Sequence, residues 1–268
     1  MLVTDSEVQD FVDEGAVVLD NLVPMSVIDA ASEGMDAFYA NHPTKSTGIV
    51  EYPIEDRLID LFQHENIEEA AKKILGSDGV ELISTAFLHT VPDGGEWSYN
   101  PDSEHVDIAF NMDELTNIPR RVCLMYMVFL DDIPADRAPT VIRPGSHKLI
   151  SQHYGSGPAP KDHPMNIKEL PDLGYADPIP LTGKKGQIAA STTALIHAGS
   201  RNVSDKPRKL LFIAFTATGT NLRFNVDRED KRLQFLQNLR EKFSPDRRYI
   251  LDSTIAALQQ NIDFGERS

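Results

Sequence analysis

The side chains of this chain that are best suited to metal chemistry are two histidines and one aspartate. His105 and Asp107 flank Val106 in a strand-like run over residues 104–110, and a strand places residues i and i+2 on the same face. His197 ends a second strand-like run, over residues 194–197. The three together would form a two-histidine, one-carboxylate facial triad, which binds a divalent metal ion and leaves three coordination positions open.

Each of these residues also has a structural explanation when the sequence is taken alone. With eight histidines in 268 residues, composition gives about an even chance of one His-x-Asp tripeptide. His105 and Asp107 fit a solvent-facing strand edge on which polar residues alternate. His197 fits a core histidine that is bonded to a backbone carbonyl group.

Arg208 lies eleven positions after His197 at the start of another strand-like run. Its guanidinium is a planar fork of donors that can hold a carboxylate in two places, which a lysine cannot do with the same geometry. An arginine at a strand start is otherwise usually a surface charge. Asn202 and Asp205 lie between the two residues and suit turn chemistry.

Four segments, in this order, resemble the phytanoyl-CoA dioxygenase family: residues 4–20, His105-x-Asp107, the run 139–148 (PTVIRPGSHK), and residues 197–208. The resemblance implies an enzyme that uses Fe(II) with 2-oxoglutarate and O2 as cosubstrates. It places iron at His105, Asp107 and His197, and a 2-oxoglutarate carboxylate at Arg208. The chain departs from the family at Gly199, where a serine that contacts the cosubstrate is common.

The same resemblance guides the expectations about chemistry and substrate. Related halogenases replace the carboxylate ligand by a small residue to admit chloride, so Asp107 argues against halogenation. Residues in the loop before the ligand strand and on the strand 140–143 are candidates for substrate binding: His89, Trp97, Tyr99 and Arg143. Thr140 and Arg143 have opposite parity, so only one of the two points inward if that strand is regular.

Short apolar and β-branched runs broken by Gly and Pro dominate the middle of the chain. Eight of them predict strands: 80–88, 104–110, 121–130, 140–143, 179–181, 187–190, 194–197 and 209–216. This spacing is typical of a mainly β fold, the double-stranded β-helix or cupin-like jelly roll, here with flanking helices. Residues 151–183 are rich in Pro and Gly and predict a long loop that serves as a lid or binding wall.

Helices are expected at both ends of the chain. Thr4-Asp5-Ser6-Glu7 has the form of a capping box, and Gly15 follows where that helix would stop. Residues 16–19 then predict a short strand. Further helices are expected from Pro24 onward, within residues 55–76, and on both sides of Pro245. We therefore expect one domain over residues 1–268, in which residues 1–78 are helix-rich, residues 79–218 form a jelly-roll core and residues 219–268 form C-terminal helices.

Composition limits the partners. Twenty-six Lys and Arg against 41 Asp and Glu give a net charge of −15, whose field repels nucleic acids and anionic membranes. The single cysteine, Cys123, lies in an apolar run and is expected in the core. Neither a secretory signal nor a membrane span is recognisable, which favours a cytoplasmic protein. The oligomeric state is not determined by these features.

The leading hypothesis is an Fe(II)/2-oxoglutarate dioxygenase that hydroxylates a small organic molecule while 2-oxoglutarate is decarboxylated to succinate. Desaturation, ring closure and epimerisation are compatible with the same ligands. A coenzyme A thioester would need a basic patch, for which the candidates are Arg120-Arg121, Lys184-Lys185 and Arg201. Two alternatives are a cupin-like metal enzyme that uses iron or zinc as a Lewis acid without 2-oxoglutarate, and a non-catalytic barrel that binds a small ligand.

Overall fold

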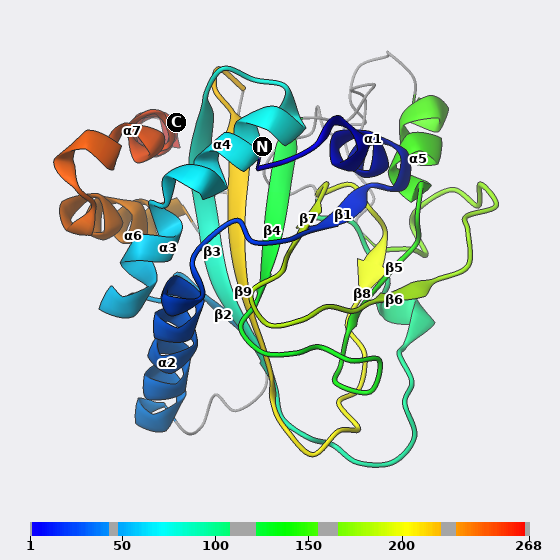
Figure 1. The fold of residues 1–268 in the computed structure, drawn as a ribbon. Coiled ribbons are helices and arrows are strands. Elements are labelled where there is room, and N and C mark those ends of the chain that lie inside the picture. The colour runs from blue at the N-terminus through cyan, green and yellow to red at the C-terminus, as the bar shows by residue number, and fades with distance from the viewer. Residues whose placement is uncertain (1, 43–47, 108–121, 155–165, 221–228, 266–268) are drawn as a thin grey trace.

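The computed structural model describes residues 2–42, 48–107, 122–154, 166–220 and 229–265. Two antiparallel sheets face each other, and helices cover the outer face of the larger one (Figure 1). The described strands form two separate sheets and not one closed barrel. The expectation of a mainly β, jelly-roll fold with flanking helices is confirmed, with two facing sheets in place of a closed barrel.

The large sheet has six strands in the order β1-β7-β4-β9-β3-β2. Its centre is the long antiparallel pair β3 and β9, which runs from Val80 opposite Ala217 to Thr90 opposite Arg208. Its two edge strands, β1 and β2, come from the helix-rich N-terminal segment. The strand predicted over residues 16–19 is confirmed as β1, whereas β2 was not predicted. The strand bounds are β1 Ala16–Leu19, β2 Gly48–Glu51, β3 Val80–Thr90, β4 Cys123–Phe129, β7 Ile188–Ser191 and β9 Arg208–Ala217.

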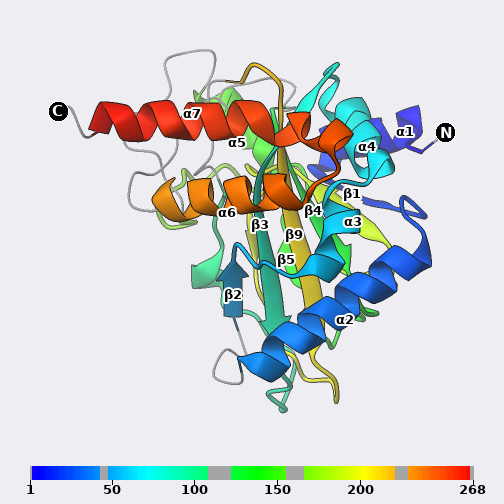
Figure 2. The same ribbon diagram turned by 90° about the vertical axis from the view of Figure 1, so that its left-hand side faces the viewer.

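A layer of helices packs on one face of this sheet and forms most of the apolar core. Figure 2 shows α6 and α7 crossing this face, with α2, α3 and α4 beside them. Aromatic and aliphatic side chains of the helices and the sheet share one buried cluster. The bounds are α2 Met25–Asn41, η2 Asp56–Leu58, α3 Ile59–Phe62, α4 Glu65–Leu75, α6 Glu229–Lys242, η6 Pro245–Arg247 and α7 Tyr249–Gly265.

The small sheet, β6-β5-β8, lies across the other face of the large sheet. Its strands are short, and β5 is paired with both neighbours. Helices α1 and α5 lie together near β1, at one end of the molecule (Figure 1). The bounds are α1 Asp5–Glu14, η3 Pro101–Ser103, β5 Thr140–Ile142, α5 Ser146–Tyr154, β6 Ile179–Leu181 and β8 His197–Ala198.

The predicted capping box is present at the start of α1. The Thr4 backbone N–H donates to Glu7 Oε2 (2.6 Å), and the Glu7 N–H donates to Thr4 Oγ1 (3.2 Å). Gly15 ends the helix in the left-handed conformation at φ 84°, which glycine adopts without a steric penalty. The helices expected after Pro24, within 55–76 and around Pro245 are also confirmed, with α3 and α4 in the second region.

Two predicted strands that carry site residues are wrong as regular strands. Instead of a strand over 104–110, His105 forms isolated bridges with His197 and Asn166, and residues 108–110 lie outside the described residues. Instead of 194–197, only His197–Ala198 is a strand. The reason is a turn in residues 192–195, where the Leu195 N–H donates to the Thr192 carbonyl (3.2 Å). Pairing between the two segments is therefore limited to the bridge between His105 and His197.

Other expectations are confirmed or corrected locally. Residues 151–154 of the expected long loop instead continue helix α5, which begins at Ser146. Cys123 is fully buried, as expected. Asn202 sets the shape of its turn, because its Nδ2 donates to the Thr90 and Lys206 carbonyls, both at 2.8 Å.

Candidate metal centre and cosubstrate site

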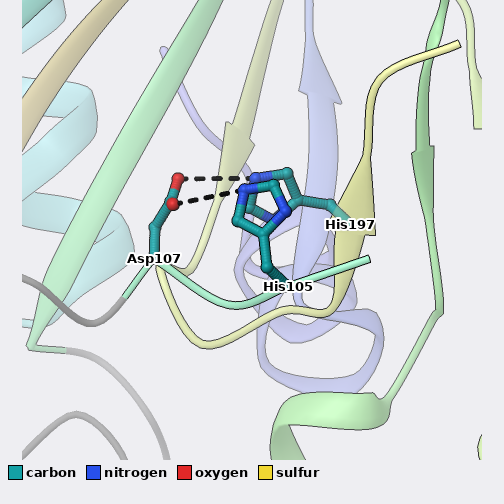
Figure 3. Close-up of side chains that lie close together, drawn as sticks. All are labelled: His105, Asp107 and His197. Atoms are coloured by element: carbon teal, nitrogen blue, oxygen red, sulfur yellow. Dashed lines mark ion pairs between the residues drawn. The ribbon is translucent and has the colours of Figure 1, made fainter. Parts of the chain in front are cut away.

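His105, Asp107 and His197 converge although they lie on irregular or very short elements (Figure 3). The His105 N–H donates to the His197 carbonyl (2.9 Å), and the His197 N–H donates back to the His105 carbonyl (3.0 Å). The Asp107 N–H donates to the Thr193 carbonyl (2.7 Å). Main-chain hydrogen bonds therefore align the loop that carries His105 and Asp107 with the start of β8.

The ligand atoms are arranged for a single ion. Asp107 oxygens lie 3.6 Å from His105 Nε2 and 3.4 Å from His197 Nε2, and the three ligand atoms all lie within 4.8 Å of one another. Two ligands at about 2.1 Å from a common ion and at right angles to each other stand about 3 Å apart. The three side chains therefore need only small shifts to hold a divalent metal.

The second ring nitrogen of each histidine is held by the backbone. His105 Nδ1 lies 2.8 Å from the Ser103 carbonyl oxygen, and His197 Nδ1 lies 3.0 Å from that of Leu195. Because a carbonyl only accepts, Nδ1 carries a proton in both rings, so Nε2, which faces Asp107, is the nitrogen that each neutral ring offers to a metal. Metal-binding histidines usually show this arrangement.

The charges of the three groups influence one another. Burial raises the pKa of Asp107, but the His197 and His105 rings outweigh this and lower the pKa below its ordinary value. Burial lowers the pKa of His197, but the charge and hydrogen bond of Asp107 raise it above its ordinary value. Burial and the neighbouring His197 ring lower the pKa of His105. Asp107 is therefore an ionised ligand at neutral pH.

Arg208 is the first residue of β9, and its side chain is buried at 2% exposure. Nη2 donates to Thr90 Oγ1 (3.0 Å), and Nη1 donates to the carbonyl of Ala138, a residue with φ 44°. Within the described residues Arg208 forms no ion pair, and its buried Nε has no hydrogen-bond partner. Burial lowers the pKa of Arg208 to about 10, so it still carries its charge at neutral pH.

A cavity of 520 Å³ between the two sheets contains both the triad and Arg208 in its lining. Thr140 of β5 also lines it, whereas Arg143 points away, as the opposite parity of these residues predicted. Gly199 lies in the same wall, and a Cβ atom built on it meets no atom within 4 Å. The space that a serine would occupy at this position is therefore open.

The four residues predicted to bind substrate are not among those that line this cavity. His89 stacks on Tyr39 of α2 with ring centroids 4.3 Å apart, on the helix side of the sheet. Trp97 is 38% exposed, and its ring centroid lies 6.3 Å from that of Tyr99. The structure does not bring these side chains to the metal ligands, and their role in substrate binding stays a prediction.

Arg143 instead forms an ion pair beside the triad. Its Nε donates to both carboxylate oxygens of Glu104 (3.0 and 2.9 Å), and Nη1 donates to the Ala176 carbonyl (3.0 Å). Glu104 is 2% exposed and precedes His105 directly. The pair thus anchors the loop that carries two of the three candidate ligands.

Comparison with known protein families gives one match. The family model of phytanoyl-CoA dioxygenase (PhyH) matches residues 11–210, which is well over half of the chain. The chain belongs to the phytanoyl-CoA dioxygenase family. The resemblance noted in the sequence is confirmed, and with it the expectation of a dioxygenase that uses iron and 2-oxoglutarate. A search of curated protein sequences found no match.

Solved structures share the fold at low sequence identity. The non-heme alpha ketoglutarate dependent carbocyclase SnoK from nogalamycin biosynthesis is 15% identical, covers 84% of this chain and 88% of its own, and has a TM-score of 0.64. EctD from S. alaskensis with 2-oxoglutarate and 5-hydroxyectoine is 16% identical, with 82% and 78% covered and a TM-score of 0.61. The epimerase SnoN in complex with Fe3+, alpha ketoglutarate and nogalamycin RO is 18% identical, with 80% and 83% covered and a TM-score of 0.57.

Sequence reasoning missed several residues around the site. Thr90 and Ala138 orient Arg208, but only the register of β3 with β9 and the fold of a loop bring them to it. Arg232 of α6 lines the cavity at 7% exposure. It precedes Leu236 by four positions and Leu239 by seven, so a charged residue on an apolar helix face was the available signal.

None of the described helices has the length and apolar character needed to cross a membrane.

Proposed function

We propose that this protein is an Fe(II)/2-oxoglutarate dioxygenase that hydroxylates a small organic molecule, with His105, Asp107 and His197 as iron ligands and Arg208 as the cosubstrate clamp. The observation that carries the proposal is that Arg208 is buried and forms no ion pair within the described residues. A buried guanidinium without an ion pair among the described residues is costly unless an anion binds to it. Arg208 shares its cavity with the triad.

The residues fit both ends of the cosubstrate. A two-histidine, one-carboxylate triad leaves three positions, enough for a bidentate 2-oxo acid and dioxygen. The guanidinium of Arg208, oriented by Thr90 and Ala138, is suited to the far carboxylate of 2-oxoglutarate. When bound, Fe(II) and 2-oxoglutarate activate dioxygen for oxidation of a substrate C–H bond, with succinate and carbon dioxide as coproducts.

The protein itself binds, orients and excludes water. Nδ1–H bonds to the Ser103 and Leu195 carbonyls keep both imidazoles in the tautomer that offers Nε2 to the metal. Apolar side chains of the large sheet, among them Met125 and Phe212, line the cavity below the triad. They would shield the reacting centre and contact the body of the substrate.

Arg208 also separates this proposal from the two alternatives. A Lewis-acid enzyme of the cupin type needs the metal ligands but has no use for a buried cation that faces the same cavity. A non-catalytic binding barrel does not need three ligand atoms arranged around one point. We also propose a cytoplasmic location, because a reducing compartment keeps iron in the ferrous state.

Anaerobic titration with 2-oxoglutarate tests the proposal. The Fe(II)-loaded full chain should develop the weak visible charge-transfer band of a chelated 2-oxo acid. Glutarate, which has both carboxylates but lacks the 2-oxo group, should compete for Arg208 without giving the band. The exposed-site variant Arg201→Gln should titrate like the unmodified protein. Absence of the band at saturating 2-oxoglutarate would refute the proposal.

A further inference from the structure

We propose that Arg232 binds an anionic group of the substrate, so that the substrate is a small organic acid with an apolar body. This inference rests on the proposed function, because it concerns the region of the cavity that 2-oxoglutarate would not fill. It names a substrate class and a residue that selects it. Neither follows from the metal ligands or from Arg208.

The strand register separates the two arginines along the cavity. Thr90 of β3 lies opposite Arg208, and Ser84 lies opposite Ala214 six residues earlier on β3. At about 3.4 Å per residue the cavity wall therefore extends about 20 Å along this strand. Arg208 lies at the Thr90 end. Arg232 is tied to the other end through Tyr52, whose N–H donates to the Thr85 carbonyl (3.0 Å) and whose hydroxyl accepts from Arg232 Nε (3.0 Å).

The cavity is most exposed to solvent along the edge strand β2, which pairs with β3 between the two ends. Arg208 is 2% exposed, whereas Ile49 on the edge strand β2, which lies opposite Leu88 and lines the same cavity, is 64% exposed. Glu51 of β2 is exposed as well and pairs with Ala86. A ligand is therefore expected to enter past β2, and both Arg208 and Arg232 are buried away from this edge, at 2% and 7% exposure.

Between the two ends the large sheet presents mainly apolar side chains. Ala86, Leu88 and Phe212 line the region between the ends, and Met125 and Ala214 lie beside Ser84. Such a surface favours a hydrocarbon chain or ring over a polar body, since each buried CH2 group contributes about 0.8 kcal/mol. The portion of the substrate that lies near the triad is thus expected to be apolar.

Arg232 supplies the charge outside this apolar zone. It is 7% exposed on α6, and its Nε donates to the hydroxyl of Tyr52 (3.0 Å). Tyr52 packs against Phe235 of the same helix, with ring centroids 5.3 Å apart. These contacts restrain a planar fork of donors at the cavity wall, which is the geometry that a carboxylate recognises.

The described lining contains only two arginines and no lysine, which argues against a polyanion such as a coenzyme A thioester. The basic candidates considered for such a substrate are engaged elsewhere. Lys185 pairs with Asp29 (2.7 Å) and Arg201 with Asp93 (2.9 Å), while Lys184 lies 3.7 Å from Asp132. Arg120 and Arg121 lie outside the described residues. An acid with one anionic group fits the cavity better.

A matched pair of probes tests the inference in the Fe(II)-loaded full chain saturated with 2-oxoglutarate, so that Arg208 is occupied. Calorimetry should show that octanoate binds at least tenfold more tightly than octanamide, which has a similar shape but no charge. Arg232→Gln should remove this preference and leave octanamide binding unchanged. Arg240→Gln, on the same helix but paired with Asp252 outside the cavity, should keep it.

Equal affinity of the unmodified protein for the two probes, or binding of neither, would overturn the inference, and this comparison needs no variant. A preference for octanoate that persists in Arg232→Gln would assign the anion site to another group and equally overturn it. The 2-oxoglutarate band, measured in the same samples, separates the two proposals. If the band appears but octanoate is not preferred, only the inference about Arg232 fails.

Discussion

The two sheets contribute to the site in different ways. Arg208 and Thr90 lie on β9 and β3, long central strands that are paired over ten residue positions and backed by the helix layer. The metal-ligand candidates lie on the two-residue strand β8 and on a loop that meets it by a single bridge. The proposed cosubstrate clamp is thus positioned by the core of the protein, whereas the proposed metal centre depends on a few local contacts and on the ion that it would bind.

The largest expected effect comes from removing a metal ligand. Asp107→Ala leaves two neutral imidazoles, so Fe(II) affinity should fall by about 100-fold or more, beyond the effect of changing a residue that only supports a ligand. Metal content after dialysis and calorimetric titration measure this change. Asp102→Ala removes an exposed carboxylate from the neighbouring η3 and should leave metal binding intact. Similar losses in both variants would mean that Asp107 is not a ligand.

The second largest effect is expected at Arg208, and it distinguishes cosubstrate binding from metal binding. Arg208→Ala should bind iron normally, because the triad does not depend on β9. Its 2-oxoglutarate affinity should fall by about 2 to 5 kcal/mol, the range for losing one partner of a buried charge pair. Anaerobic titration of the charge-transfer band gives the affinity. An unchanged dissociation constant would mean that another group binds the far carboxylate.

The dependence of the metal centre on local contacts can be tested at the Glu104–Arg143 pair. Glu104→Gln should lower metal affinity by about tenfold, because the His105 loop loses its anchor, and should cost about 1 to 3 kcal/mol in free energy of unfolding. The Arg143 side chain is 20% exposed, so the cost is smaller than for a fully buried pair. A double-mutant cycle with Arg143→Gln measures the coupling. Strictly additive effects would show that the pair does not hold the loop.

The metal centre should also respond to pH in a range where the clamp does not. A metal binds neutral imidazole, and the pKa of His197 is raised above its ordinary value of 6.5 by Asp107, which outweighs the lowering by burial. Metal affinity should therefore fall by up to about tenfold per pH unit as the pH drops below that pKa, and level off above it. Titrations between pH 5.5 and 8.5 test this. A flat profile would indicate that His197 is neutral throughout.

The sequence predicts local features well in this chain and non-local ones poorly. The capping box of α1 involves residues three positions apart, so its form is visible in the sequence. The irregular backbone around His105 depends on a turn at residues 192–195 in a distant segment, which no local pattern reveals. The triad was nevertheless recognisable, because chemistry restricts the residue types more tightly than the backbone restricts their secondary structure.

Helix α5 and the partners of Arg208 show the same limit. Residues 151–154 look like the beginning of a Pro- and Gly-rich loop, but α5 is held by contacts with α1, including a His147 Nε2 contact with the Val12 carbonyl at 3.0 Å. The resemblance to the family pointed to Arg208, which has the spacing to His197 that the family uses, whereas its burial and its contact with Thr90 follow from the register of β3 and β9. The sequence thus indicates the candidate residues, and the pairing of distant strands determines how they are held.

The smallest expected effect lies at Gly199, where the two sides of the site meet. Family members often have a serine there that contacts the cosubstrate, and the open space at this position would accept one. Gly199→Ser should tighten 2-oxoglutarate binding by up to about tenfold, the equivalent of one added hydrogen bond of 0.5 to 1.5 kcal/mol. Gly199→Ala adds the same Cβ without the hydroxyl and should bind 2-oxoglutarate like the unmodified protein. The neighbouring Ser200 hydroxyl donates to the Pro139 carbonyl (2.7 Å) and is therefore not the substitute donor. If Gly199→Ser and Gly199→Ala bind the cosubstrate equally, another group already supplies that contact, and the open space serves the substrate instead.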